Sequence, residues 1–347
     1  MKIHSDALER LVDAVLRAHG ARPDEARLVT QNLVEANLVG HDSHGVARVP
    51  RYVEAIRSGQ INVNAQVRAL SDGPSNLVLD GDWGFGQVAA ARAVDVLVEK
   101  ASGHAVACGT VHNTNDVGRL GAYTMRAAER GFLAIMTVND GGAGPHIAPW
   151  GATSPLFSTN PISATVPLEN RPAICIDMAT SVAAGSQILL ALKRGQTLPP
   201  GLILDALGRP STDPADVFAT PRGSILPLGA PVAGHKGLAL NLLVDVLAGA
   251  LSGAGCSGSS DRDAQGVFLM LLNIEAFTPR EQFTQRVLGL IEAIKSAPRA
   301  VGTPPIRIPG EQAAIEKQKR LKEGVEVDQT TWEQISAIAE ERKIRRD

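Results

Sequence analysis

The 347-residue chain has few cysteines and few aromatic residues, and neither sign of charge dominates its composition. Its cysteines, Cys108, Cys175 and Cys256, are far apart and form no CxxC pair, which excludes a disulfide framework and a cysteine-based zinc site. Because 34 Lys and Arg face 36 Asp and Glu, the overall charge does not favour a nucleic-acid partner. We expect a protein of the reducing cytoplasm.

Long apolar runs are also missing. The chain turns polar within its first residues and lacks the roughly 7 to 15 apolar residues of a signal peptide, so secretion is not expected. The most apolar stretch, 237–251, contains Asn241 and Asp245 and is shorter than the roughly 20 residues that cross a bilayer. We interpret this stretch as a buried helix and expect no membrane partner.

The spacing of apolar residues changes along the chain. Helical spacing over the first 60 residues predicts a helix that ends at Gly20, a second over 24–39 and a third over 50–59. From about residue 65, short runs rich in β-branched residues predict strands, and helices are expected near 87–100 and 120–130. The predicted strands are 76–79, 105–111, 132–138, 162–166, 174–178 and 267–272. This mixture favours an α/β fold.

The last part of the chain returns to helical patterns. Residues 278–281 have the order of a capping box, and 328–341 form an amphipathic segment. The Ser- and Gly-rich stretch 252–266 predicts a flexible surface loop. At roughly 100 to 200 residues per domain, the length suggests about two domains. We expect a helical domain made of 1–65 with 280–347, and a central α/β domain of 66–279.

A glycine-rich motif at 84–89, Gly-Phe-Gly-Gln-Val-Ala, matches the GxGxxA pattern and leads into a predicted helix. A dinucleotide-binding fingerprint also needs an acidic residue about 20 residues later, at the end of the next strand. The run 106–111 has none, so a tight turn that feeds a helix is the preferred interpretation over phosphate binding. No GxxxxGK[ST] motif is present, which disfavours a P-loop NTPase.

The segment 41–48, His-Asp-Ser-His-Gly-Val-Ala-Arg, brings an imidazole, a hydroxyl and a guanidinium close together in sequence. Arginine can bind a carboxylate with two charge-assisted hydrogen bonds, and histidine can exchange a proton near neutral pH. The alternative is a capped helix junction with exposed side chains. We do not expect a metal at His41 and His44, because no nearby set of carboxylates and cysteines completes a ligand shell.

Other polar clusters stand at predicted element ends. Gly234-His235-Lys236-Gly237 precedes the apolar helix, where backbone amides can hold an anion, although a plain entry turn would look the same. The cluster 113–119, the pair Asn160-Pro161 and the run 177–181 each follow or end a strand. Each cluster alone is more often a loop or a cap. Together with 41–48 they point to one large composite pocket.

These segments resemble the malate/L-lactate dehydrogenase family that lacks a Rossmann fold, which includes L-sulfolactate dehydrogenases, ureidoglycolate dehydrogenases and piperideine-2-carboxylate reductases. The resemblance covers most of the chain, and the order and spacing of its segments make it specific. The matching segments are HDSHGVARVPRYVEAIRSGQI at 41–61, NTNDVGRLGAY at 113–123, APWGATSPLFSTNPISATVP at 148–167, DMATS at 177–181, LPPGLILDALGRPSTDP at 198–214 and PLGAPVAGHKGLALNLLVDVLAGALSGA at 227–254.

The resemblance implies an oxidoreductase that uses NAD or NADP to interconvert a small 2-hydroxy acid and its 2-oxo acid by hydride transfer. Reduction of a cyclic imine acid, or cofactor binding without catalysis, are the alternatives. It also implies an unusual α/β fold, with a mixed or largely antiparallel sheet in the central cofactor-binding domain beside the helical domain. The resemblance further implies a homodimer, with the cofactor near the contact between the two subunits.

The resemblance also assigns residues. Ser43 and His44 belong to the active site and Arg48 to the substrate carboxylate. As a hypothesis, His44 is the general acid/base, and Asp177 or Asp116 orients the histidine or the nicotinamide amide. The residues assigned to the cofactor are Asn160, Pro161, Asp177, Met178, Ala179, Thr180, Ser181, Gly234, His235, Lys236 and Gly237.

The chain departs from the family pattern at two positions. Many members have a histidine in an Asn-Ser-Asn-His-Phe-Gly pattern, where this chain has Asp116. Some members also use a cationic residue beyond the next strand, near the place of Asp140 in this chain. Three consequences stay open: the two acids could repel a substrate carboxylate, shift specificity towards a cationic or imine-bearing substrate, or mark lost activity.

Overall fold

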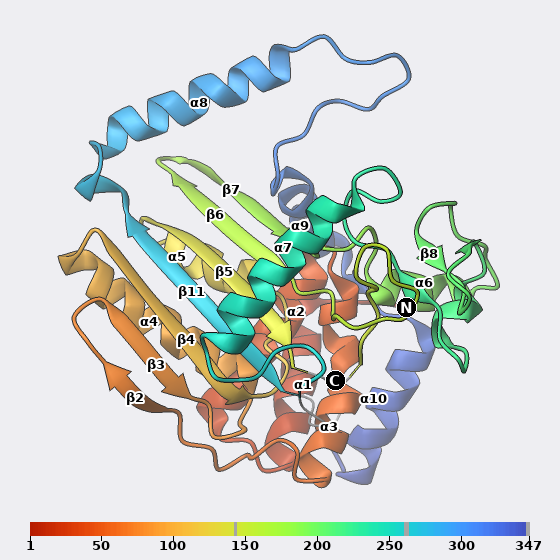
Figure 1. Ribbon diagram of the computed structural model, residues 1–347. Helices are drawn as coiled ribbons and strands as arrows, with labels where there is room; N and C mark the ends of the chain where they lie inside the picture. The colour runs from red at the N-terminus through yellow and green to blue at the C-terminus, as the bar shows by residue number, and fades with distance from the viewer. Residues whose placement is uncertain (142–143, 260–263, 345–347) are drawn as a thin grey trace.

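A seven-stranded mixed sheet forms the centre of the protein in this computed structural model, which describes residues 1–141, 144–259 and 264–344 (Figure 1). The strand order is β2-β3-β4-β11-β5-β6-β7. The neighbouring strands β3 and β4 are parallel, and the other neighbours pair antiparallel. The α/β class and the mixed sheet expected from the sequence are therefore confirmed.

All the predicted strands are present, and each is slightly longer than its pattern. The strands of the sheet are β2 (Arg68–Asp72), β3 (Asn76–Asp80), β4 (Val106–Thr114), β5 (Phe132–Asp140), β6 (Ile162–Leu168), β7 (Arg171–Met178) and β11 (Gln265–Asn273). The edge strand β2 was not predicted, because all five of its residues are exposed and it has no buried face to set an alternation.

Helices α4 (Gly86–Gly103) and α5 (Gly121–Ala128) cover one face of the sheet. The alanines of α4, among them Ala89, Ala90 and Ala93, are buried and let this helix lie close to the strands. The opposite face carries α7 (Gly234–Val244) and the π-helical segment Asp245–Ala250, which contacts β5 and β11. Of the polar clusters predicted from the sequence, 113–119 lies between β4 and α5, 177–181 begins at the end of β7, and 234–237 begins α7.

The two ends of the chain pack together. The N-terminal helices share one apolar core with Val325, Val327, Ile335 and Ala339, and the short strands β1 and β12 pair antiparallel. The elements concerned are β1 (Lys2–Ile3), α1 (Ser5–Ala18), α2 (Pro23–Leu38), α3 (Val49–Arg57), α9 (Glu311–Glu323), β12 (Val325–Glu326) and α10 (Gln329–Glu341). The division into 1–65 with 280–347 and 66–279 stays a proposal.

A smaller unit beside α7 has its own apolar core around Ile188, Ile203 and Ile225. It contains a three-stranded sheet in the order β10-β8-β9. Its elements are α6 (Gly185–Lys193), β8 (Ile203–Leu204), β9 (Pro210–Ser211), the 3₁₀ helix Pro214–Phe218 and β10 (Ser224–Ile225).

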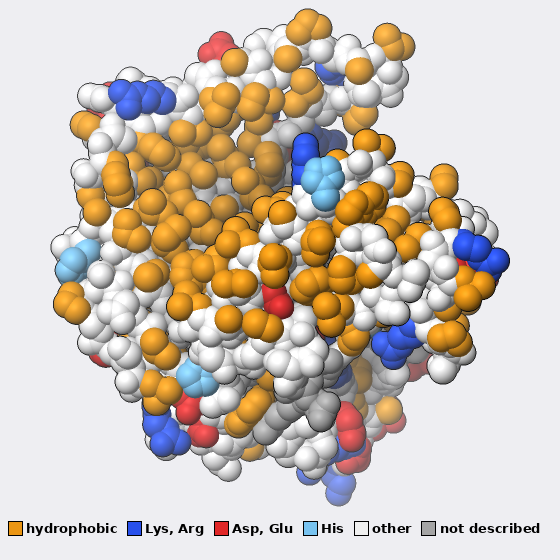
Figure 2. Space-filling model, in the orientation of Figure 1, with side chains coloured by type: hydrophobic (Ala, Val, Ile, Leu, Met, Phe, Trp, Pro, Cys, Tyr) orange, Lys and Arg blue, Asp and Glu red, His pale blue; other side chains and the backbone are white. Residues whose placement is uncertain are grey.

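The expectation of a buried helix at 237–251 is wrong. Leu242, Leu243 and Leu251 are more than half exposed, whereas Asn241 and Asp245 are buried. The polar residues turn inward because Asn241 accepts a hydrogen bond from Asn160, whose Nδ2 lies 2.9 Å away. The helix thus turns apolar side chains outward, and Figure 2 shows hydrophobic side chains gathered over this face. Within the described ranges, no helix is both long enough and apolar enough to cross a membrane.

The structure also differs from the expected capping box at 278–281 and from the expected loop at 252–266. Helix α8 (Arg280–Ser296) begins after Pro279 without a side-chain cap, so the predicted capping box does not form. The proline itself takes the N-cap position, which leaves Thr278 outside the helix. In the predicted loop 252–266, Ser252 is buried and hydrogen-bonded to Ala248, residues 265–266 belong to β11, and 260–263 lie outside the described residues.

Candidate active site

A cavity of about 360 Å³ lies between the turn at 40–44, the segment before α5 and the end of β7. Its wall also includes Ser186, Gln187 and Leu190 from α6. Six residues predicted from the sequence line it: Ser43, His44, Pro161, Asp177, Met178 and Ala179. The structure therefore brings the 41–44, 160–161 and 177–179 segments to one place, as expected for a composite pocket.

His44 ends a 3₁₀ turn, Asp42–His44, that α2 holds in position. Asn37 of α2 donates to the Asp42 carboxylate at 2.7 Å and accepts from the Val46 amide at 2.8 Å, so it fixes both ends of the turn. The Ser43 hydroxyl lies 3.1 Å from His44 Nδ1. Burial, with help from the Arg48 charge, lowers the pKa of His44 to about 4. The imidazole is therefore neutral at pH 7 and able to accept a proton.

Arg48 and Asp116 form an ion pair next to His44. Arg48 Nη1 lies 3.1 Å from Asp116 Oδ2, and Arg48 Nε donates to the Ser43 carbonyl at 2.8 Å. Burial alone would raise the pKa of Asp116, but Arg48 and His44 outweigh it and the pKa is lowered. Both charges act on the His44 ring, although neither side chain lines the cavity wall. A substrate carboxylate bound by Arg48 must share it with Asp116.

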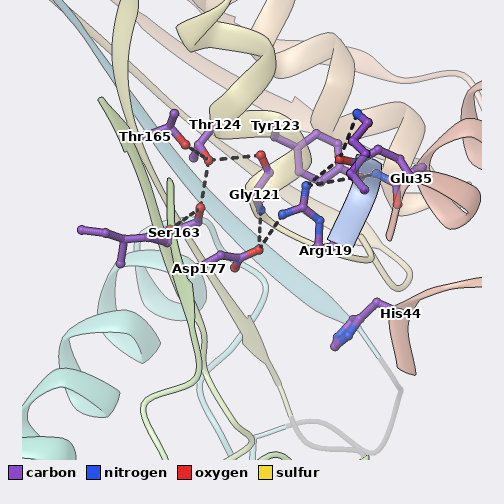
Figure 3. Close-up of polar contacts among 12 residues, drawn as sticks. Glu35, His44, Arg119, Gly121, Tyr123, Thr124, Ser163, Thr165 and Asp177 are labelled. Atoms are coloured by element: carbon purple, nitrogen blue, oxygen red, sulfur yellow. Dashed lines mark hydrogen bonds and ion pairs between the residues drawn. The ribbon is translucent and has the colours of Figure 1, made fainter. Parts of the chain in front are cut away.

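Arg119 joins Asp177 to Glu35 (Figure 3). Its Nη1 lies 3.3 Å from Asp177 Oδ2, and its Nη2 donates to both Glu35 oxygens at 3.1 and 2.9 Å. Asp177 also accepts a 2.9 Å hydrogen bond from the amide of Gly121, the first residue of α5. Burial raises the pKa of Asp177, although Arg119 opposes this effect. These partners orient Asp177 towards α5.

A second cavity of about 540 Å³ lies on the other side of Arg119, between α2, α5, β7 and the start of α9. Arg119 lines both cavities. Its Nε and the Oδ1 of Asn32 are buried without a hydrogen-bond partner, and both residues line the second cavity. Buried polar atoms of this kind are normally satisfied, so their state here indicates room for a polar ligand or water.

The other predicted cofactor residues stand behind the first cavity. Asn160 and Thr180 are fully buried, and the Thr180 hydroxyl donates to the carbonyl of Asn160 at 3.0 Å. The Ser181 hydroxyl bonds within its own turn, to Ala183. Gly234, His235, Lys236 and Gly237 form the start of α7 and line neither cavity.

The start of α7 is nevertheless packed against the predicted cofactor segment. A Cβ on Gly237 would lie 2.3 Å from the Leu228 backbone nitrogen, so this glycine is required for close contact. Leu228 in turn donates to the Thr180 carbonyl at 3.0 Å. The backbone of α7 therefore supports the 177–181 turn from behind.

Sequence reasoning did not assign Arg119 and Glu35 to the site. Arg119 ends the polar run 113–119, which is the one signal that could have singled it out. Glu35 has no such signal, because no other charged residue stands near it in the second half of α2. The motif 84–89 lines neither cavity, and Gly86 begins α4. Among the described parts of the chain, no group of three His, Cys, Asp or Glu side chains could hold a metal ion.

Comparisons with known proteins identify the family of this chain and proteins that share its fold. The family model for malate/L-lactate dehydrogenase matches residues 3–336. The chain is 35% identical to malate dehydrogenase of Pyrococcus abyssi, over 98% of this chain and 94% of that protein. It is 34% identical to the Delta(1)-pyrroline-2-carboxylate/Delta(1)-piperideine-2-carboxylate reductase of Pseudomonas putida, over 92% of each. The sulfolactate dehydrogenase structure from Methanocaldococcus jannaschii superposes with a TM-score of 0.91 at 31% identity, over 100% of this chain and 98% of that one.

Proposed function

The chain belongs to the malate/L-lactate dehydrogenase family, and on this premise we propose that it interconverts a small 2-hydroxy acid and its 2-oxo acid with NAD or NADP. The observation that carries the proposal is the buried His44 imidazole, neutral at pH 7, in the wall of a cavity beside a guanidinium. Oxidation of a hydroxy acid requires a proton acceptor for the hydroxyl and a cation for the carboxylate. His44 and Arg48 meet these two requirements.

The two cavities support binding of a dinucleotide. Each has a size typical of a small-molecule site, and they adjoin at Arg119. The unsatisfied Arg119 Nε and Asn32 Oδ1 provide one donor and one acceptor for the part of the cofactor in the larger cavity. We place the nicotinamide half beside Met178 and Ala179, within the same cavity as His44. The bound cofactor would supply hydride acceptance and donation.

The residues of the chain then divide the remaining tasks. His44 takes the hydroxyl proton as the substrate is oxidised and returns it in the opposite direction. Ser43 stays hydrogen-bonded to the ring and fixes its orientation. Arg48 would hold the substrate carboxylate, and Asp177, fixed by Arg119 and the Gly121 amide, would hold the nicotinamide amide. The remaining predicted residues, Asn160, Thr180, Ser181 and Gly234–Gly237, support this wall from behind.

The test is a panel of 2-oxo acids and cyclic imine acids, each assayed with NADH and with NADPH by the loss of nicotinamide absorbance. We expect turnover of at least one acid and a roughly 10²- to 10⁴-fold loss of kcat in His44→Gln. His104→Gln, which changes an exposed histidine, is the matched control. If His44→Gln stays within a few-fold of wild type, the assigned role is wrong. NADH binding without turnover of any acid would instead indicate a non-catalytic member of the family.

Reduction of a cyclic imine acid is a second candidate function. The observation that favours it is Asp116, a carboxylate that stands at the place where the substrate carboxylate is expected to bind. A protonated imine brings a positive charge that an acidic group accommodates. The relative from Pseudomonas putida that is named for this activity makes the comparison of substrates direct.

We also propose that the protein is a homodimer of the cytoplasm. Helix α8 has one buried residue, Thr284, and lies apart from the sheet at the top of the view (Figure 1), while Leu290 and Phe277 are more than half exposed. Figure 2 shows hydrophobic side chains gathered beneath α8 and over α7, and a patch of this kind is typical of a protein interface. Leu290→Lys should lower the sedimentation coefficient towards that of a monomer, whereas Leu207→Lys, at an isolated exposed leucine, should not.

A further inference from the structure

The Arg48–Asp116 pair changes the charge that a substrate meets beside His44. Arg48 carries the positive charge expected to bind a carboxylate, and Asp116 places a negative charge 3.1 Å from it. The Asp116 side chain is 11% exposed and that of Arg48 is 25% exposed, so solvent screens this pair only in part. Since His44 is neutral, it adds no compensating charge.

Asp116 is held where it stands by the backbone around it. Its Oδ1 accepts a 3.0 Å hydrogen bond from the Gly118 amide. Helix α4 begins directly against it, because a Cβ on Gly86 would lie 2.3 Å from the Asn115 carbonyl oxygen and 2.6 Å from that of Asp116. The carboxylate therefore has little freedom to turn away when a ligand arrives.

The Asp116 carboxylate keeps its negative charge, because burial raises its pKa less than Arg48, His44 and its other neighbours together lower it. Its Oδ2 is buried and faces Arg48, and the carboxylate also interacts with the Tyr52 side chain. Neither Arg48 nor Asp116 lines the cavity wall, so both act on a ligand beside His44 through their charge. A ligand that carries a positive charge beside its carboxylate would therefore be stabilised by both residues.

We propose that Asp116 selects the substrate by charge: it excludes dicarboxylic 2-oxo acids and favours monocarboxylic substrates, above all those whose protonated C=N nitrogen carries a positive charge. This inference rests on the proposed oxidoreductase function and specifies its substrate class. A zwitterionic imine acid leaves the Arg48–Asp116 site electrically neutral. A 2-oxo monocarboxylate adds one negative charge to this pair, and a dicarboxylate adds two, of which Arg51 compensates only a part because it acts on Asp116 more weakly than Arg48.

The expected size of the effect follows from Coulomb's law. For a second carboxylate a few ångströms from Asp116 in partly screened surroundings, the repulsion corresponds to roughly a 10- to 100-fold loss of affinity. This loss should be found mainly in KM, since the charge acts on binding before the hydride moves. The ratio of kcat/KM for a monocarboxylate to that for a dicarboxylate with the same 2-oxo group reports it directly.

The experiment compares wild type with Asp116→Asn and Asp116→Glu on a three-carbon 2-oxo monocarboxylate, a four-carbon 2-oxo dicarboxylate and a six-membered cyclic imine acid. Two kcat/KM values measured on one preparation depend equally on the fraction of folded protein and on any loss of proton transfer that affects both substrates. Their ratio is therefore independent of both. We expect wild type to prefer the monocarboxylate over the dicarboxylate at least 10-fold and the imine acid most. Asp116→Asn should reduce both preferences about 10-fold, and Asp116→Glu should keep them.

Two results would overturn the inference while the proposed function stands. One is a wild-type preference below about threefold, and the other is an Asp116→Asn variant with unchanged ratios. If wild type turns over none of the three compounds with either cofactor, the proposed function itself fails. Circular dichroism of each variant establishes that the comparison is made on folded protein.

Discussion

Replacement of Arg119 by methionine tests whether the buried ion network between the two cavities stabilises the fold. Arg119 is 6% exposed and is the shared partner of Glu35 and Asp177. Methionine keeps most of the apolar volume of the side chain but removes its charge. Asp177, whose side chain is 12% exposed, is then left with the Gly121 amide as its remaining hydrogen-bond donor.

Loss of one partner from a buried ion pair typically costs about 3 to 5 kcal/mol, because the other charge stays buried without compensation. Glu35 is 30% exposed and Lys317 lies 4.0 Å from it, so water and this lysine compensate part of the loss. We therefore expect the lower end, about 3 kcal/mol at pH 7. The Arg126–Asp95 pair is the matched control: both side chains are 40% exposed, and Arg126→Met should cost only about 0.2 to 1 kcal/mol.

The loss should depend on pH. Burial raises the pKa of Asp177 and Arg119 lowers it, so Arg119→Met raises it further. A carboxyl whose folded pKa exceeds its unfolded value stabilises the fold at low pH, and this contribution is lost as the pH rises through the folded pKa. The deficit of Arg119→Met against wild type should therefore be largest at pH 7 to 8 and should shrink towards the unfolded pKa of about 4.

Urea denaturation followed by circular dichroism, at several pH values and with the slope checked for constancy, measures these differences. The double variant Arg119→Met/Asp177→Asn should recover part of the stability at pH 7, because the uncompensated charge is gone. If Arg119→Met costs no more than Arg126→Met at every pH, the buried charges of this network do not stabilise the fold.

Two further predictions follow from the geometry around His44 and Asp116. Gly86→Ala should lower the free energy of unfolding by about 1 to 3 kcal/mol, because its Cβ would overlap the carbonyls of Asn115 and Asp116. Gly103→Ala, with open space at the other end of α4, is the control and should be neutral or slightly stabilising. The urea midpoints of the two variants measure the difference. In the direction of hydroxy-acid oxidation, kcat/KM should fall as the pH drops through about 4, where His44 becomes protonated; an acid limb near 6.5 would instead show that burial does not lower the pKa of this histidine.

Most of the sheet was predictable from the sequence because five of its strands, β3, β4, β5, β6 and β11, contain buried residues. The runs at 132–138 and 267–272 are rich in β-branched and other apolar residues, and both became central strands. The edge strand Arg68–Asp72 escaped prediction because nothing buries it. The sequence pattern reports burial, so an element held in place by backbone hydrogen bonds alone carries no such signal.

The helix at 234–244 gave the opposite error. Its leucines suggested burial, yet Leu242 and Leu243 are exposed while Asn241 is buried against Asn160. A single chain does not reveal which face of an apolar helix turns inward when buried polar groups need partners there. An exposed leucine face of this kind is what a helix would present if a second subunit covered it.

In the candidate site, too, the sequence predicts residues that are close together along the chain and misses contacts between distant segments. His44, Ser43 and Arg48 were predictable because one short segment carries them, and two of the three line a cavity. The Glu35–Arg119 contact joins residues 84 positions apart, and its acid comes from the last turn of a helix without any motif. Sequence reasoning therefore finds groups that lie together along the chain. The groups that support them from other elements become apparent only when the fold brings α2, the start of α5 and the end of β7 to one point.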